Sequence, residues 1–183
     1  MWIILGVIFA ALVYVVLTYN AFASLRNRAR NAWADVDVQL KRRHDLVPNL
    51  VAAVQGYASH EKSVFEDVAN LRAKAAQLEG IGEKAGAEND LSGAIKSIFA
   101  VAESYPELKA DANFRDLQKQ LTDIEDHIQY ARRYYNAVVR DINTKCEMFP
   151  SNLVAGWFGF GRQEYFGAAD DERESPHIKM EER

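Results

Sequence analysis

The stretch Asp111–Phe149, DANFRDLQKQLTDIEDHIQYARRYYNAVVRDINTKCEMF, contains neither Gly nor Pro. Its apolar side chains recur at steps of three and four residues, at Phe114, Leu117, Leu121, Ile124, Ile128, Ala131, Tyr135, Val138, Ile142, Cys146 and Phe149. This spacing predicts an amphipathic helix with one buried stripe, and Asp111 or Asn113 can cap its start. One stripe cannot be buried alone, so other helices must lie along it. We therefore expect an all-α fold, and the core residues that we name are Leu121, Ile124, Ile128 and Val138.

Residues 1–19 are the most apolar part of the chain, with no charged side chain after the N-terminus and mostly Ile, Leu, Val and Phe. A helix of this length spans about 27 Å, close to the hydrocarbon thickness of a bilayer. Residues 1–19 are therefore predicted to be a transmembrane anchor. The alternative is a cleaved signal peptide, because residues 21–23 read Ala-Phe-Ala, but no basic residue precedes the apolar run.

Basic residues follow the apolar run directly, at Arg26, Arg28 and Arg30. Because positive charge is retained on the cytoplasmic side, this asymmetry predicts a single-pass membrane protein with its body in the cytoplasm. The same three arginines are candidate contacts for anionic lipid headgroups. The alternative is that they only set the topology.

The apolar spacing predicts a helical bundle over residues 20–149, with helices at about 20–43, 46–78, 91–105 and 111–149. Pro48 allows two interpretations. A kink in one long helix keeps the apolar register, whereas a turn before Pro48 avoids a single helix of about 90 Å from residue 19 to residue 78. We favour the turn, and we expect residues 79–90, rich in Gly and charge, to form an exposed loop.

Residues 150–167 combine glycines with aromatic side chains and are expected to dock on the bundle, the membrane or a partner. Residues 168–183 are mostly charged and are expected to be disordered. In a four-helix up-and-down bundle, Trp157, Phe158 and Phe160 would lie near the membrane, on the same side as Arg26. These aromatics are candidate membrane or partner contacts, and the alternative is that they cap the bundle without meeting lipid.

The composition excludes several functions. Acidic residues outnumber Lys and Arg by 26 to 22, so no basic excess indicates nucleic-acid binding. The single cysteine, Cys146, excludes an intramolecular disulfide and a cysteine metal cluster. A di-iron bundle needs Glu-x-x-His pairs on two helices, and the one such pair is Glu174 and His177 in the charged tail. We expect no catalytic residue, cofactor or metal site, and therefore no enzyme.

Several motifs in the chain resemble the signature of the LemA family. They include residues 37–43 (DVQLKRR), 46–50 (LVPNL), 102–110 (AESYPELKA), 131–136 (ARRYYN) and the Phe149-Pro150 pair before the Gly-aromatic segment. The similarity covers residues 5–167 and leaves the charged tail outside. It implies a bacterial protein with one N-terminal membrane span and an α-helical up-and-down bundle. Family members are membrane-anchored, one relative being associated with magnetosome membranes, and the family's biochemical function is not established.

Two kinds of function remain. The first is an anchored interaction or scaffold module, in which the bundle presents a surface to a partner protein. The second is a structural protein that self-assembles on the membrane, which requires a self-complementary apolar patch. We favour the first, with membrane lipid and an unknown protein as partners, or self-association in its place, and no nucleic acid.

Overall fold

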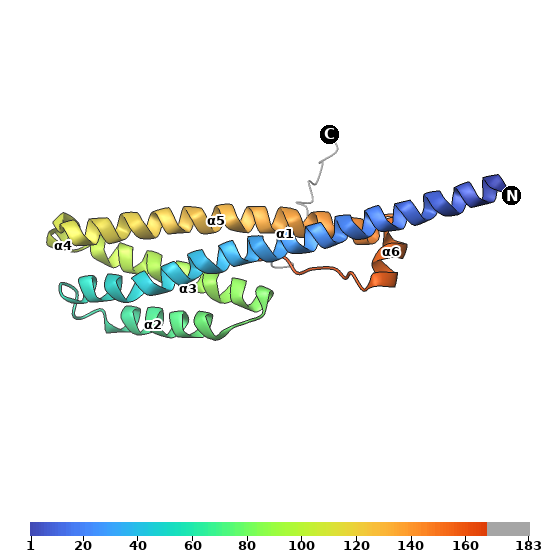
Figure 1. Ribbon diagram of the computed structural model, residues 1–183. Coiled ribbons are helices and arrows are strands. Elements are labelled where there is room, and N and C mark those ends of the chain that lie inside the picture. The colour runs from blue at the N-terminus through green and yellow to red at the C-terminus, as the bar shows by residue number, and fades with distance from the viewer. Residues whose placement is uncertain (168–183) are drawn as a thin grey trace, which may run out of the picture.

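The computed structural model describes residues 1–167, and over this range it contains helices and no strand (Figure 1). The six helices are α1 (Trp2–Gln55), α2 (Lys62–Gln77), α3 (Ile81–Glu103), α4 (Pro106–Ala110), α5 (Ala112–Glu147) and α6 (Ser151–Phe158). The long helices alternate in direction: α1 runs away from the N-terminal end, α2 returns, α3 leads away and α5 returns. The predicted all-α, up-and-down antiparallel bundle is confirmed. The predicted disordered tail, residues 168–183, lies outside the described residues.

Helix α1 is a single helix of 54 residues, about 80 Å long at 1.5 Å per residue. The turn that we expected before Pro48 is therefore absent, and the kink interpretation, with its continuous apolar register, is the better one. The backbone carbonyl of His44, which the missing N–H of Pro48 leaves free, accepts a hydrogen bond from Arg72 Nε at 2.7 Å. Because α2 supplies this donor, the proline is accommodated inside the helix. The chain turns instead between Gln55 and Lys62.

The prediction of an exposed loop over residues 79–90 is also wrong, because α3 begins at Ile81. Ala85 and Ala87 of this segment, and Leu91 directly after it, are buried and hold the helix against its neighbours. Glu88 is buried as well, and its charge is matched by side chains from α1. The glycines and charges in this segment therefore belong to the first turns of a packed helix.

Helix α5 lies close to its predicted range. Asp111 caps its start, because Asp111 Oδ1 accepts from the backbone N–H of Phe114 at 2.9 Å. Of the four core residues expected in it, Leu121, Ile128 and Val138 are buried, and Ile124 is partly buried against the same core.

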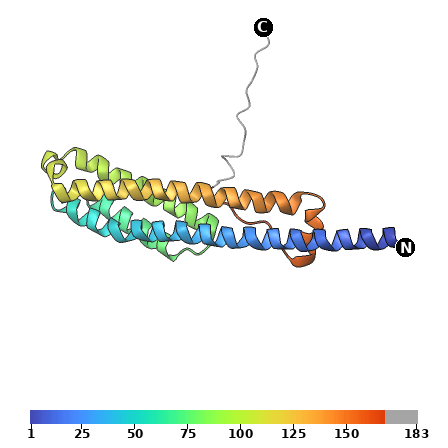
Figure 2. The same cartoon turned by 45° about the horizontal axis from the view of Figure 1, so that its top comes forward.

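The core follows the long contact between α1 and α5 in three clusters. At the end far from the N-terminus, α2 and α3 add Phe65, Val68, Leu91 and Ile98 to Leu50 and Val54 of α1. In the middle, Val36 and Leu40 of α1 pack on Ile128, Tyr135 and Val139 of α5. A small third cluster joins Ala29 to Val138 and Ile142. Beyond it, α2 and α3 are absent and α1 extends alone past the end of α5 (Figure 2).

Candidate interaction surfaces

Exposed large apolar side chains are concentrated at one end of the molecule. Residues 1–19 contribute Met1, Trp2, Ile3, Ile4, Leu5, Val7, Ile8, Phe9, Leu12, Val13, Tyr14, Val16, Leu17 and Tyr19. The end of α5 and α6 contribute Met148, Phe149, Leu153, Trp157 and Phe158. Elsewhere in the described chain this class contains only Val38, Tyr57, Tyr130 and Tyr134. Of the described helices, only α1 contains a stretch long and apolar enough to cross a bilayer.

Helix α6 has an inward and an outward face. Ser151, Val154 and Ala155 are buried against the bundle. The opposite face, at helical spacing, carries Leu153 and Trp157, which are 49% and 73% exposed. Ser151 Oγ donates to the backbone carbonyl of Lys145 at 2.7 Å, which ties α6 to the last turn of α5. In both views α6 lies across α1 rather than along it (Figures 1 and 2).

The structure separates the three aromatic residues singled out in the sequence. Phe160 packs flat on Phe22 of α1, with ring centroids 4.9 Å apart, and so covers the bundle. Phe158 is half exposed, and its ring meets Tyr19 edge-on at 4.9 Å. Trp157 faces outward. The capping interpretation therefore fits Phe160, whereas Trp157 does not cap the bundle.

Of the three candidate arginines, only Arg26 reaches the aromatic segment. Its guanidinium carbon lies 5.2 Å from the Phe160 ring centroid, a cation–π distance. Arg28 and Arg30 are exposed on α1, and within residues 1–167 they make no ion pair. Lys145 of α5 adds a further positive charge here, 5.9 Å from the Phe22 ring.

After α6, residues 160–167 return along α5 as an extended segment, here called the C-terminal strap. Two asparagines of α5 hold it, each pairing with both backbone groups of one strap residue. Asn143 bonds to the carbonyl and N–H of Gln163 at 3.0 and 2.8 Å. Asn136 does the same for Phe166 at 3.0 and 2.9 Å. Because the strap lacks regular secondary structure, these amides supply the hydrogen bonds that its backbone needs.

Tyr135 also fastens the strap, because its hydroxyl donates to the carbonyl of Glu164 at 2.9 Å. Burial and the nearby Glu164 carboxylate raise the pKa of Tyr135 to about 12, so the hydroxyl stays a donor at any physiological pH. Phe166 of the strap is buried beside Trp33, with ring centroids 5.4 Å apart. The strap thereby joins the aromatic end of the molecule to the middle of the core.

A buried ionic cluster connects α1, α3 and α5 in the centre of the bundle. Arg43, only 2% exposed, forms an ion pair with the equally buried Glu88 and a second one, of 2.8 Å, with Glu125. Its guanidinium also donates to Ser92 Oγ at 2.5 Å and to the backbone carbonyl of Glu88 at 3.2 Å. His44 Nε2 lies 2.9 Å from the other carboxylate oxygen of Glu88.

The electrostatics of the cluster favour the ionised form of the Glu88 carboxylate. Burial alone would raise the pKa of Glu88, but the His44 ring and the Arg43 guanidinium together outweigh it, and the pKa lies below its ordinary value. A buried carboxylate is tolerated only with such partners, because its desolvation is costly. The cluster therefore stabilises one arrangement of three helices. Both terminal nitrogens of Arg43 bond to protein atoms, whereas its buried Nε has no hydrogen-bond partner among the described residues.

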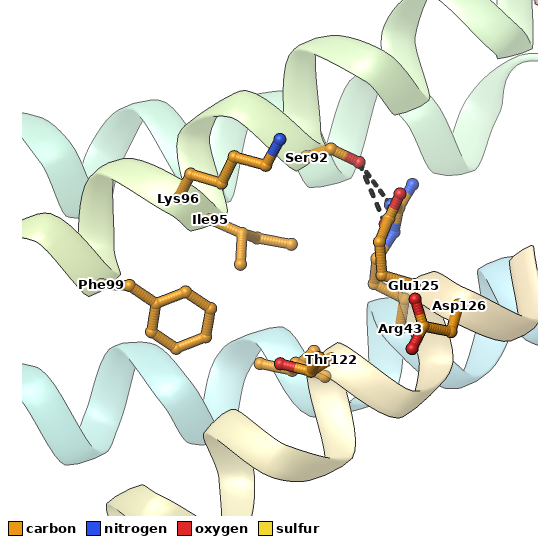
Figure 3. Close-up of a pocket in the computed structure, with 9 residues that line it drawn as sticks. Arg43, Ser92, Ile95, Lys96, Phe99, Thr122, Glu125 and Asp126 are labelled. Atoms are coloured by element: carbon orange, nitrogen blue, oxygen red, sulfur yellow. Dashed lines mark hydrogen bonds and ion pairs between the residues drawn. The ribbon is translucent and has the colours of Figure 1, made fainter. Parts of the chain in front are cut away.

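A pocket of about 220 Å³ opens beside this cluster, between α3 and α5 (Figure 3). Ile95, Phe99 and Leu121 form its apolar part, and Lys96 and Asp126 stand at its rim with opposite charges. The dashed contacts of Figure 3 join Arg43, Ser92 and Glu125 to one another rather than leaving them directed at an empty site. The pocket is therefore a concave, largely apolar surface in which few polar groups are free to bind a ligand.

A second groove, of about 440 Å³, lies on another face of the α1–α5 pair. It is lined by Gln39, Arg42, Asp45 and Leu46 of α1 and by Gln120, Asp123, Ile124 and His127 of α5. Helical spacing puts the exposed Tyr130 and Tyr134 on the same face of α5, and Val38 on the same face of α1. We call this surface the α1–α5 face.

The sequence reasoning missed the ionic cluster and the strap contacts. Arg43 lies seven residues after Val36 and three after Leu40, on the buried stripe of α1. This helical spacing could have predicted that Arg43 is buried. Glu88 was assigned to a loop, which concealed its pairing. Asn136 and Asn143 are likewise seven residues apart on α5, but nothing in the sequence indicates that an extended segment lies against them.

The histidine, cysteine and carboxylate side chains are the groups that could bind a metal ion or react. Within residues 1–167, no group of three or more His, Cys, Asp and Glu side chains is arranged to hold a metal ion. Burial and the neighbouring Glu147 raise the pKa of the Cys146 thiol, although Arg162 opposes this, so its reactive thiolate is disfavoured. The expectation that the chain is not an enzyme stays a prediction.

These features define an all-helical protein in which a long apolar N-terminal helix continues into an antiparallel bundle. The model of the LemA family matches residues 32–180. The chain therefore belongs to the LemA family. The match begins after the apolar run and continues to residue 180, so it includes most of the charged tail that the motif range of 5–167 left outside.

Several relatives share this family likeness at low identity. Magnetosome protein MamQ 2 of Paramagnetospirillum magneticum is 27% identical over 178 residues, which is 83% of this chain and 65% of the relative. Magnetosome protein MamQ of Magnetospirillum gryphiswaldense is 26% identical with the same coverage. Protein LemA of Metamycoplasma hominis is 24% identical, over 81% of this chain and 68% of its own length. The chain thus spans about two thirds of the length of each of these relatives.

Proposed function

We propose that this chain is a membrane-anchored interaction module, without catalytic activity, whose bundle presents a surface to a partner protein at the bacterial inner membrane. The observation that carries the proposal is the distribution of exposed apolar side chains, which gather on residues 1–19 and on the adjoining α6. An apolar surface of this extent is stable only when lipid or protein covers it. The relatives named as magnetosome proteins support an association with membranes.

The partner surface that we propose is the α1–α5 face. It combines a groove with the exposed Tyr130 and Tyr134, and tyrosine and arginine are the residue types enriched where proteins bind each other. Helices α2 and α3 and the strap pack on α1 and α5 through the core clusters, and none of them lines the groove of the α1–α5 face. The body is expected to lie in the cytoplasm, since Arg26, Arg28 and Arg30 follow the apolar run.

Purification of the full chain in mild detergent, with the mass of the particle measured by light scattering, tests this proposal. We compare the natural chain with a Tyr130→Ser, Tyr134→Ser double variant and with Tyr57→Ser, which alters an exposed tyrosine outside the face. We expect a second protein, in a fixed ratio to this chain, to copurify with the natural chain and with Tyr57→Ser. It should be lost from the double variant.

The same experiment tests self-assembly, the alternative function. Particles that contain several copies of this 20.7 kDa chain and no other protein, and that dissociate in the double variant, would mean that the α1–α5 face pairs with itself. A monomer without a partner in all three preparations would contradict both functions for this face.

A further inference from the structure

We propose that the outward face of α6 is a second membrane-binding element, which lies on the lipid surface beside the point where α1 leaves the bilayer. This inference rests on the proposed anchor and adds a binding surface to it. Its occupant is the headgroup region of the same membrane, and the residues that would enter that region are Leu153 and Trp157, with Phe149 just before the helix.

The first support is the position of α6 along α1. Its end contacts Tyr19, the last residue of the apolar run, through Phe158, and the residue after its C-cap contacts Phe22 through a stacked ring. If residues 1–19 cross the bilayer, these contacts put α6 level with the boundary between hydrocarbon and water. Trp and Tyr are favoured at this depth because their rings are apolar and their N–H or O–H groups are hydrated.

The second support is the orientation of α6. The helix lies across α1 (Figures 1 and 2), so it runs along the membrane surface when α1 crosses the membrane. Its buried face is already used against the bundle, and Leu153 and Trp157 point the other way. A helix that lies in the interface in this way buries its apolar face among the headgroups and upper acyl chains.

The third support is the charge around α6. Arg26 lies over the Phe160 ring and Lys145 lies near the Phe22 ring, so both basic side chains adjoin the aromatic contacts. Arg162 follows in the strap, and it forms an exposed ion pair with Glu147 at 3.3 Å. Basic side chains just outside the hydrocarbon attract anionic headgroups. Basic side chains therefore lie beside the apolar and aromatic residues of α6, where they could contact anionic headgroups while the apolar residues contact lipid.

The three natural tryptophans provide the test, because each occupies a different level: Trp2 in the apolar run, Trp157 in α6 and Trp33 in the body. Trp33 lies fourteen residues after Tyr19, about 21 Å farther along α1. We make three full-length variants that each keep one tryptophan and replace the other two with Phe. Each is reconstituted into phosphatidylcholine–phosphatidylglycerol vesicles with and without brominated acyl chains, which quench fluorescence on contact.

We expect brominated lipid to lower the emission of Trp157 and of Trp2 roughly twofold, as for side chains at the interface, and to leave Trp33 unchanged. Trp2 quenched with Trp157 unaffected would overturn this inference and keep the anchor. Trp157 quenched with Trp2 unaffected would keep the lipid contact of α6 and overturn the span. Neither quenched would overturn both.

A matched pair of substitutions distinguishes lipid binding by this face of α6 from non-specific binding of the protein to vesicles. Leu153 and Val38 are equally exposed, at 49%, but Val38 belongs to the α1–α5 face. In the variant that keeps only Trp157, Leu153→Asp should reduce the quenching and Val38→Asp should not. Equal quenching in all three proteins would contradict the assignment of this face to lipid. Circular dichroism of each variant establishes that the helices are intact.

Discussion

At the scale of single residues, the best-defined feature is the charge that the bundle buries. Arg43 contributes one positive charge, and Glu88 and Glu125 contribute two negative charges, with His44 beside Glu88. Such clusters often add little net stability over a well-packed apolar core, but removing one partner is costly because the other is left buried and unpaired. Their main consequence here is that α1, α3 and α5 meet in one register.

This cluster predicts a change of stability with pH. The pKa of Glu88 is lower in the folded chain than its ordinary value of 4.5, so its stabilising contribution is complete above that value and is lost as the pH falls through the lowered pKa. Glu88→Gln should destabilise the protein at neutral pH by about 1.5–3 kcal/mol, the usual contribution of hydrogen bonds to charged groups. Its midpoint of thermal unfolding should then approach that of the natural chain in acid.

Circular dichroism between pH 7 and pH 3, on the full chain in mild detergent, measures this difference. Glu103→Gln is the control, because Glu103 is an exposed carboxylate on the same helix. If the melting curves of the natural chain and of Glu88→Gln keep a constant separation over this range, Glu88 is not the group that responds.

At the scale of elements, α1 presents the main departure from expectation. A proline inside a helix removes one hydrogen bond and is usually a reason to end the helix. In this chain the carbonyl that loses its partner, that of His44, receives Arg72 Nε from α2. A donor 28 residues away cannot be recognised from local spacing, so the choice between a kink and a turn was open until the neighbouring helix was known.

The same bond predicts an energetic coupling between Pro48 and Arg72. In the natural chain, Arg72→Met leaves the His44 carbonyl without its donor. In a Pro48→Ala background, the new backbone N–H can satisfy that carbonyl, so the same substitution should cost less, by about 1 kcal/mol. Thermal or urea unfolding of the four proteins in the cycle measures the coupling. Lys74→Met, which alters an exposed residue of α2, is the control. An equal cost of Arg72→Met in both backgrounds would contradict this account of Pro48.

Other elements differ in how far the sequence determines them. Helix α5 was predictable because its apolar stripe is long and unbroken and because Asp111 caps the start of the helix. Helix α3 was not, because Gly82, Gly86 and the charges around them are typical of a loop, and only the partners of Glu88 explain its burial. The strap was placed near the bundle by composition alone, while its course depends on Asn136 and Asn143.

At the scale of the whole molecule, the result is a rod with one apolar end. The predicted break near Pro48 lies instead at residues 56–61, and the third long helix begins at Ile81 rather than at residue 91. The number of long helices in the described chain is nevertheless four, as predicted. With an even number, α5 ends beside the start of the body, so α6 meets Tyr19 and Phe22. The even number of long helices was thus enough to predict the end of the bundle at which the aromatic residues lie. The outward direction of Trp157 could be known only from the side-chain packing in the structure.

We propose that residues 1–19 cross a membrane once and leave the bundle in the cytoplasm. Fusion of the full chain, at its C-terminus, to green fluorescent protein and in parallel to alkaline phosphatase measures this directly in bacteria, because the first reporter is active in the cytoplasm and the second in the periplasm. We expect fluorescence in the membrane fraction and no phosphatase activity, since the basic residues that follow the apolar run are retained inside. Active phosphatase without fluorescence, or a soluble product whose N-terminus is Ser24, would contradict the claim.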